Sequence, residues 1–247
     1  MLMTSLEKYL RATVPRHLWT ILFISLGVLT PNGASAKGFF FDLNANYMIS
    51  KIERVSNTSS SFSLISTSGQ VIGLKTGMEL GKSYATYLAV EALTQSFVGP
   101  STRTFQNAES SPTRLDIGFS YFYKDIELFA RVGQHDFLAL NDLDATTHDL
   151  QKNAMSTFSL GMALTAQSKT NFSLDAEAVL TAGLGSVEFN SDTITLVSGL
   201  TGTLRIIFGK KFQYGILTTM HINEYKTTAE TYTHTDFYNG LFGTFNF

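Results

Sequence analysis

The chain contains no cysteine among its 247 residues. Disulfides, thiolate zinc sites and a lipidated N-terminal cysteine are therefore excluded, and the stability of the fold must come from packing and backbone pairing. Only 15% of the residues are charged, and the formal net charge is −2. Because nucleic-acid binding needs a concentrated basic surface, this weak and evenly spread charge excludes a nucleic-acid partner.

Long hydrophobic runs are also absent. The uncharged apolar run 18–30 is 13 residues long, short of the roughly 18 to 20 residues of a membrane-spanning helix. Basic residues precede this run, and Ala34 and Ala36 follow it. This order is typical of a secretory signal peptide, since small residues at these two positions suit the signal peptidase. We therefore expect a signal peptide over 1–36 and an exported mature domain over 37–247.

After residue 37 the dominant pattern is an alternation of apolar and polar residues with a period of two, which is typical of β-strands. In the first run, Phe41, Leu43 and Tyr47 alternate with Asp42 and Asn46. Charged residues concentrate on the less apolar face of such runs. Ten strands are predicted: 39–51, 71–80, 84–96, 114–123, 126–134, 156–165, 171–181, 193–208, 212–223 and 236–247.

The lengths of the connections favour an up-and-down barrel in the outer membrane. Short connections such as 81–83 and 124–125 alternate with longer ones such as 52–70, 97–113 and 135–155. Barrels of this kind have short periplasmic turns, long outer loops, an apolar outer face and a polar interior. The strands of a soluble β-sandwich also alternate between apolar and polar residues, but a sandwich does not require short and long connections to follow one another in turn.

Closure of the sheet follows from the backbone. Unpaired N–H and C=O groups do not survive in hydrocarbon, so the last strand must pair with the first. Aromatic residues beside the short turns and the termini predict one interfacial girdle. The predicted fold is therefore an all-β, transmembrane, antiparallel up-and-down barrel of ten strands with both termini in the periplasm.

Several short stretches carry a resemblance to a known family. The segments 38–41, 73–77 and 128–133 resemble the small outer-membrane porin-family barrels of Gram-negative bacteria, a group that includes the OmpA-type membrane domains. The resemblance implies the outer membrane as the location, and eight strands as the alternative count. The terminal alternation ending in Phe245 and Phe247 is similar to the signal recognised by the barrel-assembly machinery, which the resemblance therefore implies as a partner during biogenesis.

Six charged residues are predicted to lie at similar heights along the barrel axis, on the inner face of the sheet. Isolated buried charges are costly, so these side chains should pair with one another and with water. An interior ion-pair network of this kind would block the lumen, and a gated narrow pore is the alternative. The residues are Lys75, Glu91, Arg131, Asp175, Glu177 and Arg205.

Histidines beside carboxylates are the candidates for catalysis, because such pairs can activate water. They occur at 135–136, 148–149 and 234–236, but none has the Asp-x-His spacing of the omptin-type outer-membrane proteases. His221 lies on the inner face, which argues against a lipid A deacylase, because that enzyme needs its histidine on the lipid side. No catalytic residue is therefore expected.

The acidic segment 141–144 could supply oxygen ligands to Ca²⁺, but it lacks the glycine turn and distal glutamate of a calcium loop. We expect neither a metal nor a cofactor. In the stretch 56–68, nine of thirteen residues are Ser or Thr, which predicts an exposed tip without its own core. Phe62, Leu64 and Ile65 interrupt it, and would either extend the hairpin above the membrane or touch a partner.

The expected function is that of a non-enzymatic surface protein, a monomer surrounded by outer-membrane lipids. Its barrel would anchor loops that contact host, phage or envelope components. A narrow channel for small solutes is the second hypothesis. A hydrolase acting on lipid A or peptides is the third and least favoured.

Overall fold

The computed structural model describes residues 36–57, 61–106, 108–167, 172–189, 192–209 and 212–247. The chain divides into two units, Met1–Ala36 and Lys37–Phe247. The predicted signal peptide with Ala34 lies outside the described residues, so cleavage after Ala36 stays a prediction. Within the described part, no helix is long and apolar enough to cross a membrane.

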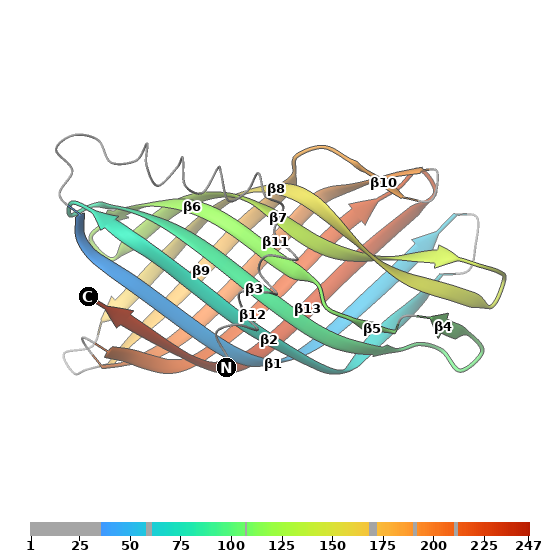
Figure 1. Cartoon of the computed structure of the whole chain (residues 1–247), viewed down its shortest axis with the longest axis horizontal. Coiled ribbons are helices and arrows are strands. Elements are labelled where there is room, and N and C mark those ends of the chain that lie inside the picture. The colour runs from blue at the N-terminus through green and yellow to red at the C-terminus, as the bar shows by residue number, and fades with distance from the viewer. Residues whose placement is uncertain (1–35, 58–60, 107, 168–171, 190–191, 210–211) are drawn as a thin grey trace, which may run out of the picture. The chain divides into compact units, whose positions relative to one another are not determined.

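Ten long strands form a closed ring in the second unit (Figure 1). They are β1 (Ala36–Ser56), β2 (Phe62–Leu80), β3 (Tyr84–Val98), β6 (Thr113–Tyr123), β7 (Ile126–Asp142), β8 (Thr147–Gln167), β9 (Phe172–Gly183), β11 (Asp192–Phe208), β12 (Phe212–Lys226) and β13 (Glu230–Asn246). Three short strands lie in the outer connections: β4 (Thr104–Gln106), β5 (Glu109–Ser110) and β10 (Val187–Phe189).

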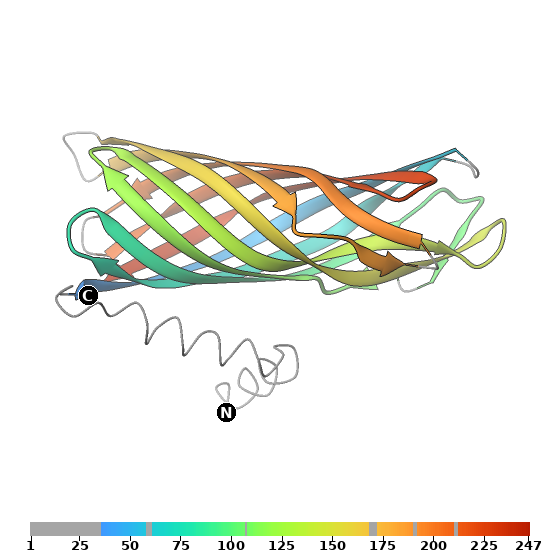
Figure 2. The ribbon, with the colours of Figure 1, turned by 90° about the horizontal axis from the view of Figure 1, so that it is seen from above.

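The ring closes where the last strand pairs with the first. β13 runs antiparallel to β1 from the pair Phe40–Asn246 to the pair Ser56–Glu230. The predicted antiparallel barrel is therefore confirmed, and ten strands rather than eight form its wall. Figure 2 shows that the turns joining β2 to β3 and β6 to β7 lie at the same end of the barrel as the C-terminus.

Alternation along each strand places apolar side chains outside. On β1, Leu43 and Tyr47 are 47% and 54% exposed, whereas Asp42 and Asn46 between them are each 7% exposed. On β11, Leu200 is likewise exposed and its neighbour Thr201 is buried. The outward apolar side chains form a lipid-facing belt around the lower part of the barrel, as expected of outer-membrane strands.

The belt ends where charged side chains first occupy outward positions. Lys51 and Glu53 on β1, Lys152 on β8, and Glu224 and Lys226 on β12 all point outward and are partly exposed. Because a charge in hydrocarbon is expensive, these residues mark the end of the apolar belt. The strands continue beyond the belt.

This continuation corrects two predicted loops. In the segment predicted as the connection 52–70, β1 runs to Ser56 and β2 begins at Phe62. In the predicted connection 135–155, β7 and β8 leave only the turn 143–146 between them. The predicted exposed tip at 56–68 is also wrong in part, because Leu64 is 1% exposed. These residues extend the hairpin, which was one of the two alternatives.

Above the belt the inner side chains become apolar and form a core, which we call the outer cap. This core gathers side chains from nearly every strand at the end of the barrel opposite the short turns. Its buried members are Ile52, Leu64, Phe97, Phe137, Leu138, Ala139, Leu140, Leu150, Met155, Phe189, Ile194, Leu196, Tyr225 and Tyr232. A packed apolar cluster therefore lies at this end of the barrel.

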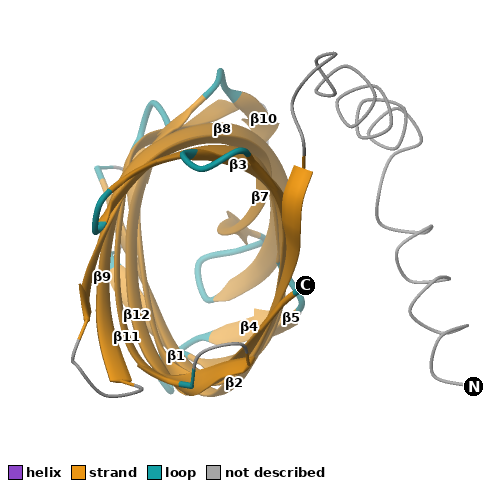
Figure 3. Cartoon of the chain, turned by 90° about the vertical axis from the view of Figure 1, so that its left-hand side faces the viewer, coloured by secondary structure: helices purple, strands orange, loops and turns teal. Residues whose placement is uncertain are grey.

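The β7–β8 hairpin bends across the mouth to build this core. β7 and β13 lie on opposite sides of the ten-strand ring, yet the Tyr232 hydroxyl of β13 donates a hydrogen bond to the Leu140 carbonyl of β7 at 3.2 Å. The rings of Phe137 on β7 and Tyr225 on β12 stack with centroids 4.8 Å apart. Figure 3, viewed along the barrel, shows β7 within the outline of the ring.

Candidate functional site

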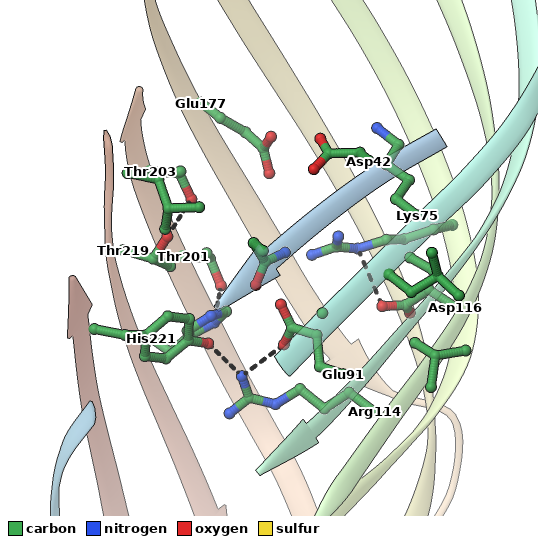
Figure 4. Close-up of a pocket in the computed structure, with 18 of the residues that line it drawn as sticks. Asp42, Lys75, Glu91, Arg114, Asp116, Glu177, Thr201, Thr203, Thr219 and His221 are labelled. Carbon is green, nitrogen blue, oxygen red and sulfur yellow. Dashed lines mark hydrogen bonds and ion pairs between the residues drawn. The ribbon is translucent and has the colours of Figure 1, made fainter. Parts of the chain in front are cut away.

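A polar cavity of about 110 Å³ lies in the lumen below the outer cap. Charged side chains from several strands line it, including Asp42, Lys75, Glu91, Arg114 and Glu177 (Figure 4). All of them occupy the inner parity of their strands. The cavity is therefore the place where the barrel gathers its interior charge.

Arg114 of β6 is the most completely paired cation of the lumen. Its guanidinium lies 2.7 Å from Asp236 and 3.4 Å from Glu91, and it donates a further hydrogen bond of 2.6 Å to the Tyr238 hydroxyl. The Ser50 hydroxyl donates to the same Asp236 carboxylate at 2.5 Å. These contacts tie β1, β3, β6 and β13 together at the upper end of the cavity.

Two other arginines make longer ion pairs. Arg131 lies 3.9 Å from Asp116, a carboxylate that also bonds His135 at 2.9 Å. Arg205 lies 3.4 Å from Asp42. In both arginines the Nε atom is buried without a hydrogen-bond partner.

The six residues predicted as an interior network occupy the lumen, but none pairs with another member of the set. All except Asp175 line the cavity. The ion-pair partners of Glu91, Arg131 and Arg205 are Arg114, Asp116 and Asp42, respectively. Whether these charges block the lumen stays a prediction.

The partners missed at the sequence level were visible as inward charges. Asp42, Arg114 and Asp116 all lie on the polar parity of their strands. Choosing among inward charges requires the stagger between tilted strands, which counting from the turns does not supply. The stagger places Arg114 on β6 opposite Glu91 on β3 in register, a pairing that only the sheet geometry reveals.

A second polar cluster fastens the hairpin at the outer cap. Arg54 of β1 is 3% exposed and forms an ion pair of 2.6 Å with Asp142 at the end of β7. It also pairs with Glu230 of β13. Burial alone would raise the pKa of Asp142, but hydrogen bonds from Arg54 and His148 outweigh burial and lower it. Asp142 is therefore held as a carboxylate in the folded cap.

His148 completes this cluster from the other arm of the hairpin. Its Nδ1 lies 2.6 Å from Asp142, and its Nε2 lies 2.5 Å from the guanidinium of Arg103. Because a guanidinium can only donate, Nε2 accepts and Nδ1 carries the proton. The ring also packs against both Phe62 and Phe105, with centroids 4.9 and 5.4 Å away.

The candidate calcium segment 141–144 serves the turn of this hairpin. Asp142 is occupied by Arg54 and His148, as described above. Asp144 accepts hydrogen bonds from the backbone and side chains of Thr146 and Thr147, and these bonds lower its pKa to about 2. Within the described chain, no group of acidic or histidine side chains is arranged to hold a metal ion.

The histidine–carboxylate pairs in the structure differ from those expected from adjacency. His135 pairs with Asp116, and His148 with Asp142. A general base needs a free ring nitrogen that can reach substrate. Both nitrogens of His148 are engaged, whereas the His135–Asp116 pair faces the lumen cavity. His221 also faces this cavity, and its Nδ1 lies 2.6 Å from the Thr201 hydroxyl.

The predicted assembly signal lies on the lipid-facing side at the short-turn end. The ring of Phe245 packs against Phe212 at 4.6 Å and Phe41 at 6.5 Å. Phe247 is 81% exposed, and its backbone N–H donates to the Phe39 carbonyl. These aromatic residues belong to the interfacial girdle, and recognition by the assembly machinery stays a prediction.

Solved outer-membrane barrels have a similar fold. The outer membrane protease OmpT from Escherichia coli superposes with a TM-score of 0.52 at 8% identity, covering 88% of this chain and 99% of that chain. An outer membrane channel from Pseudomonas putida F1 has a TM-score of 0.47 at 12% identity, covering 89% of this chain and 100% of that chain. No protein-family model and no curated protein sequence matches.

The similarity to OmpT supports the resemblance at the level of the outer-membrane barrel fold, and it does not identify an OmpA-type protein. They also correct the expectation of a barrel without an enzymatic centre. A protease shares this barrel fold at a TM-score above 0.5. The fold therefore leaves enzymatic activity open, and the exclusion drawn from histidine spacing is wrong.

Proposed function

We propose that this protein is an outer-membrane surface protein, whose closed barrel anchors the folded outer cap for contact with host, phage or envelope components. The proposal is carried by one observation, which is that the strands continue past the lipid belt and enclose an apolar core. A packed core costs free energy to open, so it favours a stable external platform over an open pore.

The hairpin contacts support the same conclusion. Arg54, Asp142 and Glu230 join β1, β7 and β13 above the membrane. Leu143 and Leu184, in the connections beside the cap, are 49% and 56% exposed, which gives the platform apolar contact points. The lipid belt and its girdle support an outer-membrane location.

Planar-bilayer recording tests the proposal. We expect no steady openings from the unmodified barrel. A variant that joins Leu138 directly to Lys152 through an Asn-Gly turn removes the crossing hairpin, and we expect it to conduct. These two residues are register partners on β7 and β8, so a two-residue turn can connect them. Leu143→Ser, at the exposed turn of the same hairpin, is the matched control and should stay closed.

A narrow channel for small solutes is the second candidate, because the lumen contains a polar cavity below the cap. Large, steady openings of the unmodified protein would place this function first. Openings that are identical in the unmodified protein and in the hairpin variant would also show that the cap does not close the barrel.

A further inference from the structure

Two opposite charges in the lumen cavity have no ionic partner. Lys75 on β2 forms no ion pair with any described residue, and Glu177 on β9 forms neither an ion pair nor a hydrogen bond there. The ammonium of Lys75 instead lies over the ring of Tyr87, 4.1 Å from its centroid. Around it, the arginines and the remaining cavity carboxylates are paired with each other.

The ring topology explains why these two charges do not meet. Four long strands separate β2 from β9 in either direction around the ten-strand ring, so Lys75 and Glu177 extend from opposite walls. Figure 4 shows the two side chains on different sides of the cavity. The cavity therefore has an ammonium group without an ion-pair partner on one wall and a carboxylate without one on the opposite wall.

Further lining groups lack hydrogen-bond partners. Arg131 and Arg205 each have an unused Nε donor, and Asn46 and His221 have unpartnered Oδ1 and Nε2 atoms. Asn46 is only 7% exposed. Buried polar atoms are normally hydrogen-bonded, and these donors and acceptors belong to residues that line the cavity.

We propose that the cavity binds a small zwitterion, with its carboxylate facing Lys75 and Arg131 and its ammonium group facing Glu177. Charge-assisted hydrogen bonds at both ends would satisfy both walls. An ion of one sign would leave the opposite wall unpaired and desolvated. The cavity volume of about 110 Å³ holds roughly ten waters, which is room for an amino acid but not for a peptide of several residues.

This site is independent of the proposed surface function, because it lies below the outer cap and involves none of the cap residues. The length of the ligand is a measurable variable. Zwitterions with different charge separations should bind differently, since the two walls are fixed by opposite strands. Glycine, 4-aminobutanoate and 6-aminohexanoate form a suitable series, and acetate and methylammonium are the probes with one charge.

Isothermal titration calorimetry of the folded barrel in detergent tests the site. We expect saturable binding of at least one amino acid in the series, at least about tenfold tighter than acetate or methylammonium. Absence of saturation with all three amino acids would show that the cavity holds only water and would overturn the proposal. Equal affinity for the singly charged probes would also overturn it.

Variants of Lys75 and Glu177 provide a second test of the proposed site. Lys75→Met and Glu177→Gln should each weaken binding about tenfold or more, whereas Lys226→Met on the outer face should not change it. Heat-modifiable gel migration checks that each variant is folded. The double variant Lys75→Glu/Glu177→Lys exchanges the charges and should bind again with the ligand reversed. Unchanged affinity in both single variants, or no recovery in the folded double variant, would contradict the assignment.

Discussion

Arg54 holds the outer cap together as a single buried cation between two carboxylates. Arg54→Met removes the ion-pair partner that Asp142 and Glu230 share. Loss of one member of a buried ion pair costs about 3 to 5 kcal/mol, so the free energy of unfolding should fall by that order. Urea titration of the barrel in detergent micelles measures it.

Lys51→Met is the matched control for Arg54→Met. Lys51 is on the same strand and pairs with Glu53 at 2.6 Å, but both side chains are more than 40% exposed. Exposed pairs contribute about 0 to 1 kcal/mol. Equal losses of stability in the two variants would mean that Arg54 is not the buried connection described above.

Asp142 gives the cap a dependence on pH. Its pKa is lowered in the folded state, so its carboxylate stabilises the cap above the usual Asp pKa of about 3.9. That contribution is lost as the pH falls from this value through the folded pKa. Limited proteolysis between pH 7 and pH 3 should therefore show the cap opening at the acid end of this range.

Asp142→Asn tests the assignment of this acid-dependent opening to one residue. The amide does not titrate, so the variant cap should be weaker at pH 7 but should lose less protection between pH 4 and pH 3. An unchanged loss of protection over this interval would place the responsible carboxylate elsewhere in the cap.

At the scale of the strand, alternation predicts one half of each element better than the other. The lower ends of the strands agree closely with the pattern; β7, for example, begins at Ile126 and β12 at Phe212 in both. The outer ends were missed because the alternation reverses above the lipid belt. There the apolar side chains face inward and the polar side chains face outward. On β13, Tyr232 and His234 point inward and are buried, while Thr233 between them points outward.

This inversion gives a prediction within one strand and one face. Leu241 is 67% exposed in the lipid belt, and Thr233 is outward above the belt. Arg at a lipid-facing position costs about 2 to 4 kcal/mol near the middle of the bilayer and about 0 to 1 kcal/mol near the interface. Leu241→Arg should therefore destabilise the barrel in vesicles much more than Thr233→Arg, by folding titration. Equal losses of stability in the two variants would mean that Thr233 also lies within the lipid belt.

The terminal strand carries a separate prediction about assembly. Phe247 is exposed at the girdle, and its truncation removes only one peripheral ring. Phe247→Ala should therefore fold normally in detergent, as judged by heat-modifiable migration. The resemblance to clients of the assembly machinery predicts lower abundance of the variant in the outer membrane of cells.

Phe245→Ala provides the comparison, because its ring contacts Phe212 and Phe41. This variant should also lose stability in detergent. If Phe247→Ala reaches the outer membrane at normal levels, the assembly role of the terminal residue is removed. If it fails in detergent as well, its role is structural.

At the scale of the whole molecule, barrel closure was predictable because it follows from backbone chemistry. Unpaired strand edges are not tolerated in hydrocarbon, so β13 had to meet β1. The interior pairing was not predictable, because it depends on stagger: Arg131 meets Asp116 and leaves Glu177 alone. The cap was hidden as well, since the hairpin crosses to the opposite wall through contacts such as Tyr232 with Leu140.

The proposed surface platform requires that a folded cap above the membrane closes the outer mouth, and the absence of native cysteine allows a direct test. Single cysteines at Glu53, Leu140 and Tyr47 report on external solvent, cap core and lipid. A membrane-impermeant maleimide added to intact cells should label position 53 rapidly and should leave positions 140 and 47 protected. In the Arg54→Met variant, position 140 should become accessible to the label, because Asp142 and Glu230 lose the ion-pair partner that they share. Labelling at 140 as fast as at 53 in the otherwise unmodified barrel would contradict it.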